Sequence, residues 1–434
     1  MSQFKQRYHR ILRELSDQLV ELQRPIRILD SIKWSSEIQA KFFAKHGKEL
    51  PVIDVDYYKK NRLSFDIKTK QQDFYCLEQK IIQKIGRSSS AGSIMLRMCG
   101  EYRQVLHLLE ARGRREFTGL SQKLYGSAED AFYVDAPRLK DLAKTVSSAL
   151  KNIQNKTHNE LDKKKYNSEQ AANLLNQRLS RYFGYGGLKK FKPLVKASDD
   201  IVADAAAGSE VIKIRQDAWF SERDLKILEV HEGWVHMGTT LNGAAQPICT
   251  FLSKGTPSST ATQEGLAILM EVFHFVSSPL RVQRLTDRIT AIAMAEAGAN
   301  FLEVFDFFQS EAQSPEESYN SAVRIFRGSL PEQGPFTKDL VYSKGFIIIY
   351  NYLRLAVQEG LIERLPLLFV GKTSLENQRL LANLMEEGLL VVPRYIPQQF
   401  KDLAALSCWM CYSVFLNKLD LSRIAIDYRK ILEG

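Results

Sequence analysis

A short stretch near the middle of the sequence contains the residue types of a hydrolytic metal site. His231, Glu232 and His236 stand in the segment HEGWVH, so that one carboxylate lies between two imidazoles. Imidazole nitrogens are preferred ligands of zinc, and a carboxylate beside them can act as a general base. We therefore expect this segment to bind a zinc ion and to support hydrolysis.

The spacing of the two histidines decides whether they can share one ion. Zinc hydrolases with a related motif place them four positions apart, on one face of an α-helix. Here the gap is five positions, which on a regular α-helix separates the side chains by about 140°. A π-helical turn of about 4.4 residues would leave them roughly 50° apart. The motif therefore predicts a π-bulged helix, eased by Gly233; the alternative is a regular helix with two unrelated histidines and a surface carboxylate.

A catalytic zinc ion needs a third protein ligand and keeps its fourth position open. The sequence Gln-Glu-Gly-Leu occurs twice and offers Glu264 and Glu359. Glu264 follows His236 by 28 residues, a length that allows a second helix to return across the first. Glu359 precedes Gly360, which is typical of a helix C-terminus. Spacing favours Glu264 and leaves Glu359 open.

The segments around the motif predict the elements that position it. Residues 210–217, EVIKIRQD, alternate apolar and charged side chains, as in a strand with one buried face. Ser221 and Asp224 form a capping box at the start of the motif helix. This helix is expected to end at Asn242-Gly243, and a second helix to begin around Thr262.

The first part of the chain is predicted to be mainly helical. Apolar residues from Tyr8 to Leu22 follow one helical face up to Pro25, and residues 94–112 form another helix that Gly113 ends. Residues 50–68 are expected to be extended or irregular. A basic stretch with Gly and Pro at 181–193 suggests a boundary. We predict a basic N-terminal region, 1–196, and a catalytic region, 197–434, which either stand apart or pack as one unit.

Charge is distributed unevenly between the two parts. Of the 60 Lys and Arg and 50 Asp and Glu in the chain, residues 1–200 hold 38 basic and 23 acidic side chains, a net charge of +15. The remainder therefore has a net charge of −5, which together with the first part gives the +10 of the whole chain. Such asymmetry indicates either an acidic partner or a solubilising basic surface.

Three segments resemble a known family. HEGWVH, LNGAAQP (241–247) and TQEGLA (262–267) are similar to the bacterial flavohaemoglobin-expression-modulating QEGLA-motif proteins and, more distantly, to the microtubule-associated tyrosine carboxypeptidases. The resemblance is dense from about residue 201 to 345, where it includes KIRQDAWFSERDL and FTKDLVYSKGF, and looser over most of the chain.

The resemblance implies a zinc site and a reaction. Residues His231, His236 and Glu264 correspond to the metal ligands and Glu232 to the catalytic base. It implies a zinc-dependent carboxypeptidase with Zn²⁺ as cofactor and a protein or peptide C-terminus, in our interpretation an acidic one, as substrate. We predict an α+β, predominantly helical fold with a zincin- or gluzincin-like core and a small twisted sheet beside the active-site helix. The rival hypothesis is a regulatory or scaffold protein with a structural or dormant metal site.

A carboxypeptidase also needs a cation for the terminal carboxylate, and the planar fork of arginine suits it. Five basic residues of the second half are candidates: Lys213, Arg215, Arg324, Arg327 and Lys338. Tyr342 is predicted to donate a hydrogen bond to the developing oxyanion. The strand at 210–217 is expected beside the cleft, where it could bind an extended peptide by β-addition.

Other function classes are disfavoured by the sequence. The segment VGKT (370–373) lacks the first glycine of a phosphate-binding loop, because Pro366 stands there. No apolar run is long enough to span a membrane, and no specific nucleic-acid motif occurs. Five cysteines do not form a disulfide framework, and Cys408 and Cys411 are interpreted as buried helical thiols. With no visible signal peptide, we expect a cytoplasmic protein.

Overall fold

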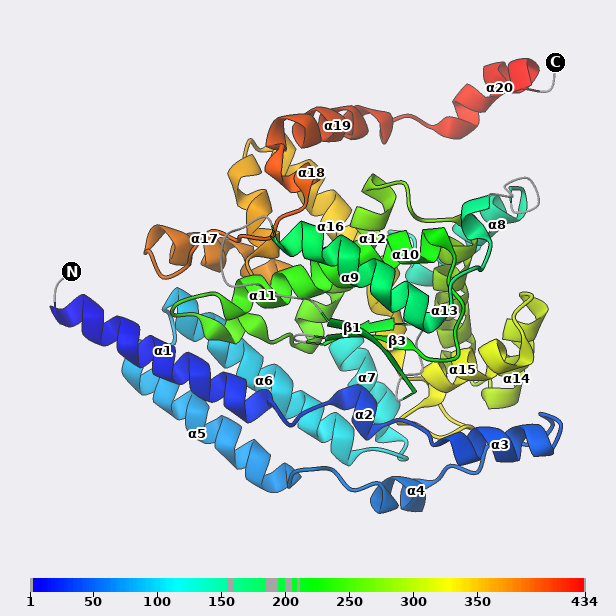
Figure 1. The fold of residues 1–434 in the computed structure, drawn as a ribbon, viewed down its shortest axis with the longest axis horizontal. Helices are drawn as coiled ribbons and strands as arrows, with labels where there is room; N and C mark the ends of the chain where they lie inside the picture. The colour runs from blue at the N-terminus through cyan, green and yellow to red at the C-terminus, as the bar shows by residue number, and fades with distance from the viewer. Residues whose placement is uncertain (1–2, 154–159, 185–193, 200–204, 209–210, 433–434) are drawn as a thin grey trace.

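The computed structural model describes residues 3–153, 160–184, 194–199, 205–208 and 211–432. It is mostly helical with one small sheet (Figure 1), which confirms the predicted α+β, predominantly helical class. Among these residues, no helix is both long enough and apolar enough to cross a membrane.

Helices make up the described N-terminal part. In chain order they are α1 (Gln3–Gln23), α2 (Ile28–Ser31), α3 (Ser36–Ala44), α4 (Val55–Lys60), α5 (Ile67–Ile85), α6 (Ser90–Glu110), α7 (Glu116–Tyr125), α8 (Leu139–Lys151), η2 (Glu160–Asp162) and α9 (Ser168–Gly184). The helices predicted from Tyr8 and over 94–112 are α1 and α6. The expectation of an irregular segment over 50–68 is wrong for α4, because the Asp54 side chain accepts a hydrogen bond from the Tyr57 amide and caps this helix.

The sheet has three strands in the described part of the chain: β1 (Leu194–Ser198), β2 (Ala205–Ala207) and β3 (Val211–Arg215). β3 lies in the middle, parallel to β1 and antiparallel to β2. Ile212 and Ile214 are buried in one cluster with Leu175 and Leu179 of α9. The alternation of EVIKIRQD therefore does mark one buried face.

The remaining elements follow from residue 222. They are α10 (Glu222–Leu228), η3 (Glu229–Met237), α11 (Gly238–Ala244), η4 (Thr250–Ser253), α12 (Pro257–Phe273), α13 (Pro279–Glu296), α14 (Phe301–Ser310), α15 (Pro315–Phe326), η5 (Thr337–Leu340), α16 (Val341–Gln358), η6 (Ile362–Phe369), η7 (Leu375–Asn377), α17 (Gln378–Glu386), α18 (Gln398–Lys401), α19 (Leu403–Leu416) and α20 (Leu421–Leu432). The capping box at Ser221 and Asp224 is confirmed. Cys408 and Cys411 lie on α19 as expected, but both are exposed, so the prediction that they are buried is wrong. α12 begins five residues before the predicted Thr262, because Thr256 caps it and Pro257 occupies its first turn.

Helices α12 and α16 cross at two glycines. A Cβ atom on Gly265 would lie 2.0 Å from the backbone carbon of Gly345, and one on Gly345 would lie 2.0 Å from the carbonyl oxygen of Ala261. Only glycine fits at so close a backbone approach. The glycine of the QEGLA segment thus fixes the position of its neighbour, Glu264, relative to α16.

The main hydrophobic core contains residues from both halves of the chain. Leu12, Leu19 and Leu109 share one buried cluster with Phe251 and Leu252 of η4. In Figure 1 the blue helices α1, α5 and α6 lie side by side below the green and orange helices of the second half. The boundary at residue 196 stays a prediction, although the described residues on its two sides bury a common core.

Candidate metal centre

The two motif histidines lie on a π-helix. Residues 222–244 form one helix in which the middle segment, η3, is π-helical from Glu229 to Met237. This geometry turns the side chains of His231 and His236 to the same side, with ring centroids 4.8 Å apart. The predicted irregular helix is confirmed, and the alternative of a regular helix is wrong.

Gly233 lets this π-helix pack directly on its neighbour. A Cβ atom at Gly233 would lie 2.2 Å from Cδ2 of Leu179 in α9. The next residue, Trp234, stacks on Tyr182 of the same helix, with ring centroids 5.2 Å apart. The contact with α9 therefore stabilises the π-helical turn. This effect adds to the lower free-energy cost of distorting a helix at a glycine.

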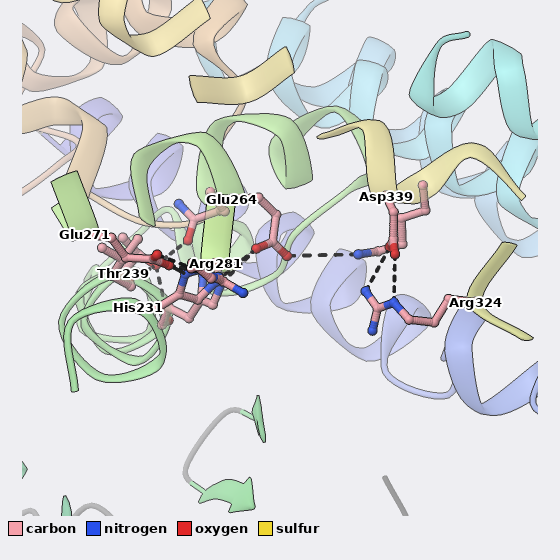
Figure 2. A network of polar contacts seen from close by, with 11 residues as sticks. His231, Thr239, Glu264, Glu271, Arg281, Arg324 and Asp339 are labelled. Carbon is pink, nitrogen blue, oxygen red and sulfur yellow. Dashed lines mark hydrogen bonds and ion pairs between the residues drawn. The ribbon is translucent and has the colours of Figure 1, made fainter. Parts of the chain in front are cut away.

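Glu264 of α12 lies between the two imidazoles (Figure 2). Its Oε2 atom is 3.2 Å from Nε2 of His231 and 3.3 Å from Nε2 of His236. Two ligands bound tetrahedrally to one zinc ion at about 2.0–2.1 Å are separated by about 3.3 Å. The three side chains thus fit the donor set and the spacing of a zinc centre. Glu359 is exposed at the C-terminal cap of α16 and is not part of this group.

Glu232 adds a second carboxylate to the group. Ligand atoms of His231, Glu232 and His236 lie within 4.8 Å of one another. Glu264 makes the closer contacts to both rings, at 3.2 and 3.3 Å. Two carboxylates, Glu264 and Glu232, therefore lie beside the two imidazoles.

The buried carboxylate of Glu271 fixes the orientation of the His231 ring. Nδ1 of His231 lies 2.7 Å from Oε1 of Glu271, and Arg281 donates to both oxygens of Glu271 at 2.9 and 3.1 Å (Figure 2). This contact leaves Nε2 to face the metal position, as ligand histidines require. Glu271 was not predicted from the sequence, although it follows Glu264 by seven residues and therefore lies on the same helical face.

The hydrogen bonds and charges around His231 and Glu271 favour a positive charge at the imidazole. Burial alone would favour the neutral imidazole, but hydrogen bonds to Glu264 and Glu271 raise the pKa of His231 to about 10. Burial would also raise the pKa of Glu271, yet the charge of Arg281 and the hydrogen bond from His231 hold it at about 2. The carboxylate of Glu271 therefore stays charged, and negative potential surrounds the imidazole.

Two further residues of the site were not identified from the sequence. The Thr239 hydroxyl donates a 2.7 Å hydrogen bond to Oε1 of Gln263, so the glutamine of the QEGLA segment ties α12 to the motif helix. Lys372, in the VGKT segment, lies on another side of the site. Burial lowers the pKa of Lys372 to about 8, and the negative charges of Glu264 and Glu232 limit that fall.

The predicted role of the strand at 210–217 is wrong in one respect. β3 is the central strand, paired along one edge with β1 and along the other with β2, so its edges are not open for β-addition. β2 is the strand that packs against η3. Lys213 and Arg215 lie on β3, and Nε of Arg215 is 3.2 Å from Asp217.

The other predicted substrate residues lie outside this sheet, on and next to α15 and on η5. Arg324 donates to both oxygens of buried Asp339 at 2.7 and 3.0 Å (Figure 2), and its role in substrate binding stays a prediction. Nζ of Lys338 lies 4.0 Å from Oε1 of Glu264. The ring of Tyr342 lies 6.4 Å from the His231 ring, centroid to centroid.

Two histidines on a distorted helix and a glutamate from the following helix form the residue set of the zinc-hydrolase class. The family model for microtubule-associated tyrosine carboxypeptidases matches residues 40–418, and the chain belongs to this family. It is therefore a carboxypeptidase-type hydrolase at the level of the family. No curated protein matches the chain.

Proposed function

We propose that this protein is a zinc-dependent carboxypeptidase in which His231, His236 and Glu264 hold the metal and Glu232 is the catalytic base. The observation that supports it most is the position of one carboxylate oxygen of Glu264, within 3.3 Å of both imidazoles. These residues come from two helices and converge only because η3 is a π-helix.

Each residue of the site is proposed to have a separate role in peptide hydrolysis. When bound, zinc supplies a Lewis acid that lowers the pKa of coordinated water toward about 7. Glu232 takes the proton of the attacking water and passes it to the leaving amine. Tyr342, whose ring centroid is 6.4 Å from that of His231, is proposed to donate a hydrogen bond to the oxygen on which charge develops. Glu271 keeps Nε2 of His231 directed at the metal.

The substrate is proposed to be the C-terminus of a protein or peptide. The matching family is named for carboxypeptidase action on tyrosine, so a terminal tyrosine is the first residue to test. The net charge of +15 in residues 1–200 favours an acidic tail next to the cleaved residue.

Replacement of Glu232 by Gln tests this function. We expect the variant to bind zinc in wild-type amounts, measured by elemental analysis, and to lose at least about a thousandfold in peptide cleavage, because a general base is removed. Release of a C-terminal residue is followed by mass spectrometry on an acidic peptide ending in tyrosine. Glu229→Gln is the matched control, since Glu229 lies on the same π-helix but faces Arg178 at 3.7 Å.

The outcome also decides between an enzyme and a scaffold. Equal cleavage by the wild type and the Glu232→Gln variant would remove Glu232 from the reaction. Bound zinc without cleavage of any terminus in a proteome-wide digest would favour the structural or dormant site. Absence of zinc from protein purified without chelators would contradict both.

A further inference from the structure

Cations outnumber the carboxylates beside the proposed metal centre. Arg288 of α13, Arg324 of α15, Arg327 at the C-terminal cap of α15 and Lys338 of η5 gather around Tyr342 and Asp339. Within 4.0 Å of these four cations the described part of the chain places two carboxylates, Asp339 and Glu264. Asp339 accepts two hydrogen bonds from Arg324, and Glu264 contacts the two histidines.

Among the described residues, no hydrogen bond joins the Arg327 guanidinium to a partner. The residue is 6% exposed, its Nε atom is buried without a partner in this part of the chain, and the guanidinium lies over the Phe336 ring, 5.8 Å from the ring centroid. A guanidinium has five N–H donors. Burying them unpaired is costly, so a buried arginine normally faces an anion.

Arg288 is in a similar position. Its Nε atom lies 3.8 Å from Asp339, beyond hydrogen-bond distance, and its guanidinium lies over the Tyr342 ring at 5.4 Å. No hydrogen bond joins its guanidinium to another described residue. Burial, followed by repulsion from Arg324, lowers the pKa of both Arg288 and Arg327 to about 10. In the described part of the chain, neither guanidinium therefore has a carboxylate within hydrogen-bond distance.

The position of Tyr342 connects this pair to the metal centre. The tyrosine ring is 6.4 Å from the His231 ring and 5.4 Å from the Arg288 guanidinium. A single side chain thus connects Arg288 to a histidine of the proposed metal centre. In a carboxypeptidase the terminal carboxylate lies one residue beyond the bond that is cut, so its binding site must lie close to the metal.

We propose that Arg288 and Arg327, here called the arginine pair, bind the C-terminal carboxylate of the substrate and restrict the enzyme to chain ends. This inference rests on the proposed peptidase function and adds the residues that determine exopeptidase specificity. The carboxylate supplies the acceptors that the buried N–H donors lack, and the planar forks can bind it bidentately. Arg324, already paired with Asp339, holds the surrounding framework.

Binding to an inactive protein tests the arginine pair separately from catalysis. The full-length Glu232→Gln protein is titrated with an acidic dodecapeptide ending in tyrosine, either as the free acid or as the C-terminal amide. We expect the acid to bind at least about tenfold more tightly, since a charged, bidentate contact is lost in the amide. Adding Arg327→Gln or Arg288→Gln should reduce acid binding to the level of the amide, and Arg327→Lys should restore part of the difference.

Two controls separate binding from structure. Arg284→Gln changes an arginine one turn earlier on α13 that pairs with Glu317 near the surface, and it should leave the acid preference intact. The melting temperature of Arg327→Gln without peptide should be unchanged or higher, because an unpaired buried charge is removed. Arg324→Gln should lower it, because Asp339 is left buried without its partner.

The possible results distinguish this inference from the proposed function. Equal binding of acid and amide, or an acid preference that survives both arginine substitutions, overturns the arginine pair even if the wild type hydrolyses peptides. An acid preference that both substitutions abolish supports the pair, whether or not the wild type cleaves the peptide. Failure of the wild type to cleave any peptide would instead contradict the catalytic proposal.

Discussion

At the scale of single residues, Glu271 links the metal ligands to the protein interior. It is fully buried, accepts two hydrogen bonds from Arg281 and contacts Nδ1 of His231. Partners of this kind set the tautomer and direction of a ligand histidine, and their loss typically reduces metal affinity by about 10–100-fold. The role of Glu271 is therefore positional.

We predict that Glu271→Gln weakens zinc binding by about 10–100-fold while the fold is retained. The amide keeps the shape of the side chain but removes the charge that holds both Arg281 and His231. Zinc affinity is measured by competition with a chromophoric chelator. Glu303→Gln, which changes a cap of α14 far from the motif helix, should bind zinc as the wild type does; a wild-type affinity in Glu271→Gln would contradict the prediction.

The sequence predicts some residues of the site better than others, for physical reasons. His231, Glu232 and His236 are adjacent in the chain, so their chemistry is visible in one short segment. Glu264 could be preferred by spacing because a single loop separates its helix from the motif. The pairing of Arg324 with Asp339 could not be predicted, because Asp339 lies 15 residues away on another element and such pairing depends on tertiary packing.

At the scale of elements, the π-helix is the feature on which the site depends. A spacing of five positions cannot work on a regular α-helix, and the chain provides both the distortion and its support. The support is the contact between Gly233 and Leu179 of α9. The five-residue spacing of the histidines predicted the π-helix, since only a wider turn places both side chains on one face. The contact with α9 could not be predicted from the local sequence.

We predict that Gly233→Ala destabilises the protein by about 1–3 kcal/mol, since the new methyl group would overlap Leu179. Leu179→Ala alone should cost about 2–5 kcal/mol through the cavity it leaves. The double variant should lose less than the sum of the two, because each change relieves the other. Urea unfolding of the four proteins measures this coupling.

A second pair of variants serves as the reference for this cycle. A Cβ atom on Gly119 of α7 would meet no atom within 4 Å. Gly119→Ala combined with Leu179→Ala should therefore give additive changes in the free energy of unfolding. Additivity for Gly233→Ala with Leu179→Ala as well would show that the contact does not support the π-helix.

At the scale of the whole molecule, stability should depend on pH through a buried carboxyl group outside the site. Asp287 of α13 is 3% exposed and accepts a hydrogen bond from Gln283. Burial raises the pKa of Asp287 from 3.8 to about 6. The folded state thus binds this proton more tightly than the unfolded state, so the contribution is favourable below about pH 4 and is lost as the pH rises through 6.

We predict that Asp287→Asn is more stable than the wild type at pH 7 by about 1–2 kcal/mol, after allowance for partial solvation. At pH 4 the difference should nearly vanish, because the wild-type carboxyl group is then protonated. Urea unfolding at both pH values measures it. Asp306→Asn, on the exposed side of α14, should show the same difference from the wild type at both; a constant difference for Asp287→Asn would contradict the assignment.

The shared core makes a prediction about the two halves of the chain. Phe251 and Leu252 of η4 are buried with residues of α1 and α6, and the Ser16 hydroxyl accepts a 2.8 Å hydrogen bond from the amide of Phe251. A fragment of residues 197–434 would expose this apolar surface and leave such groups unpaired. We expect it to aggregate or to unfold without a cooperative transition, whereas co-expression with residues 1–196 should restore a soluble complex that binds zinc. Circular dichroism during heating and gel filtration measure this. A cooperative, monomeric fragment would show that the catalytic region is an independent domain, because it would have to form its core without the N-terminal helices.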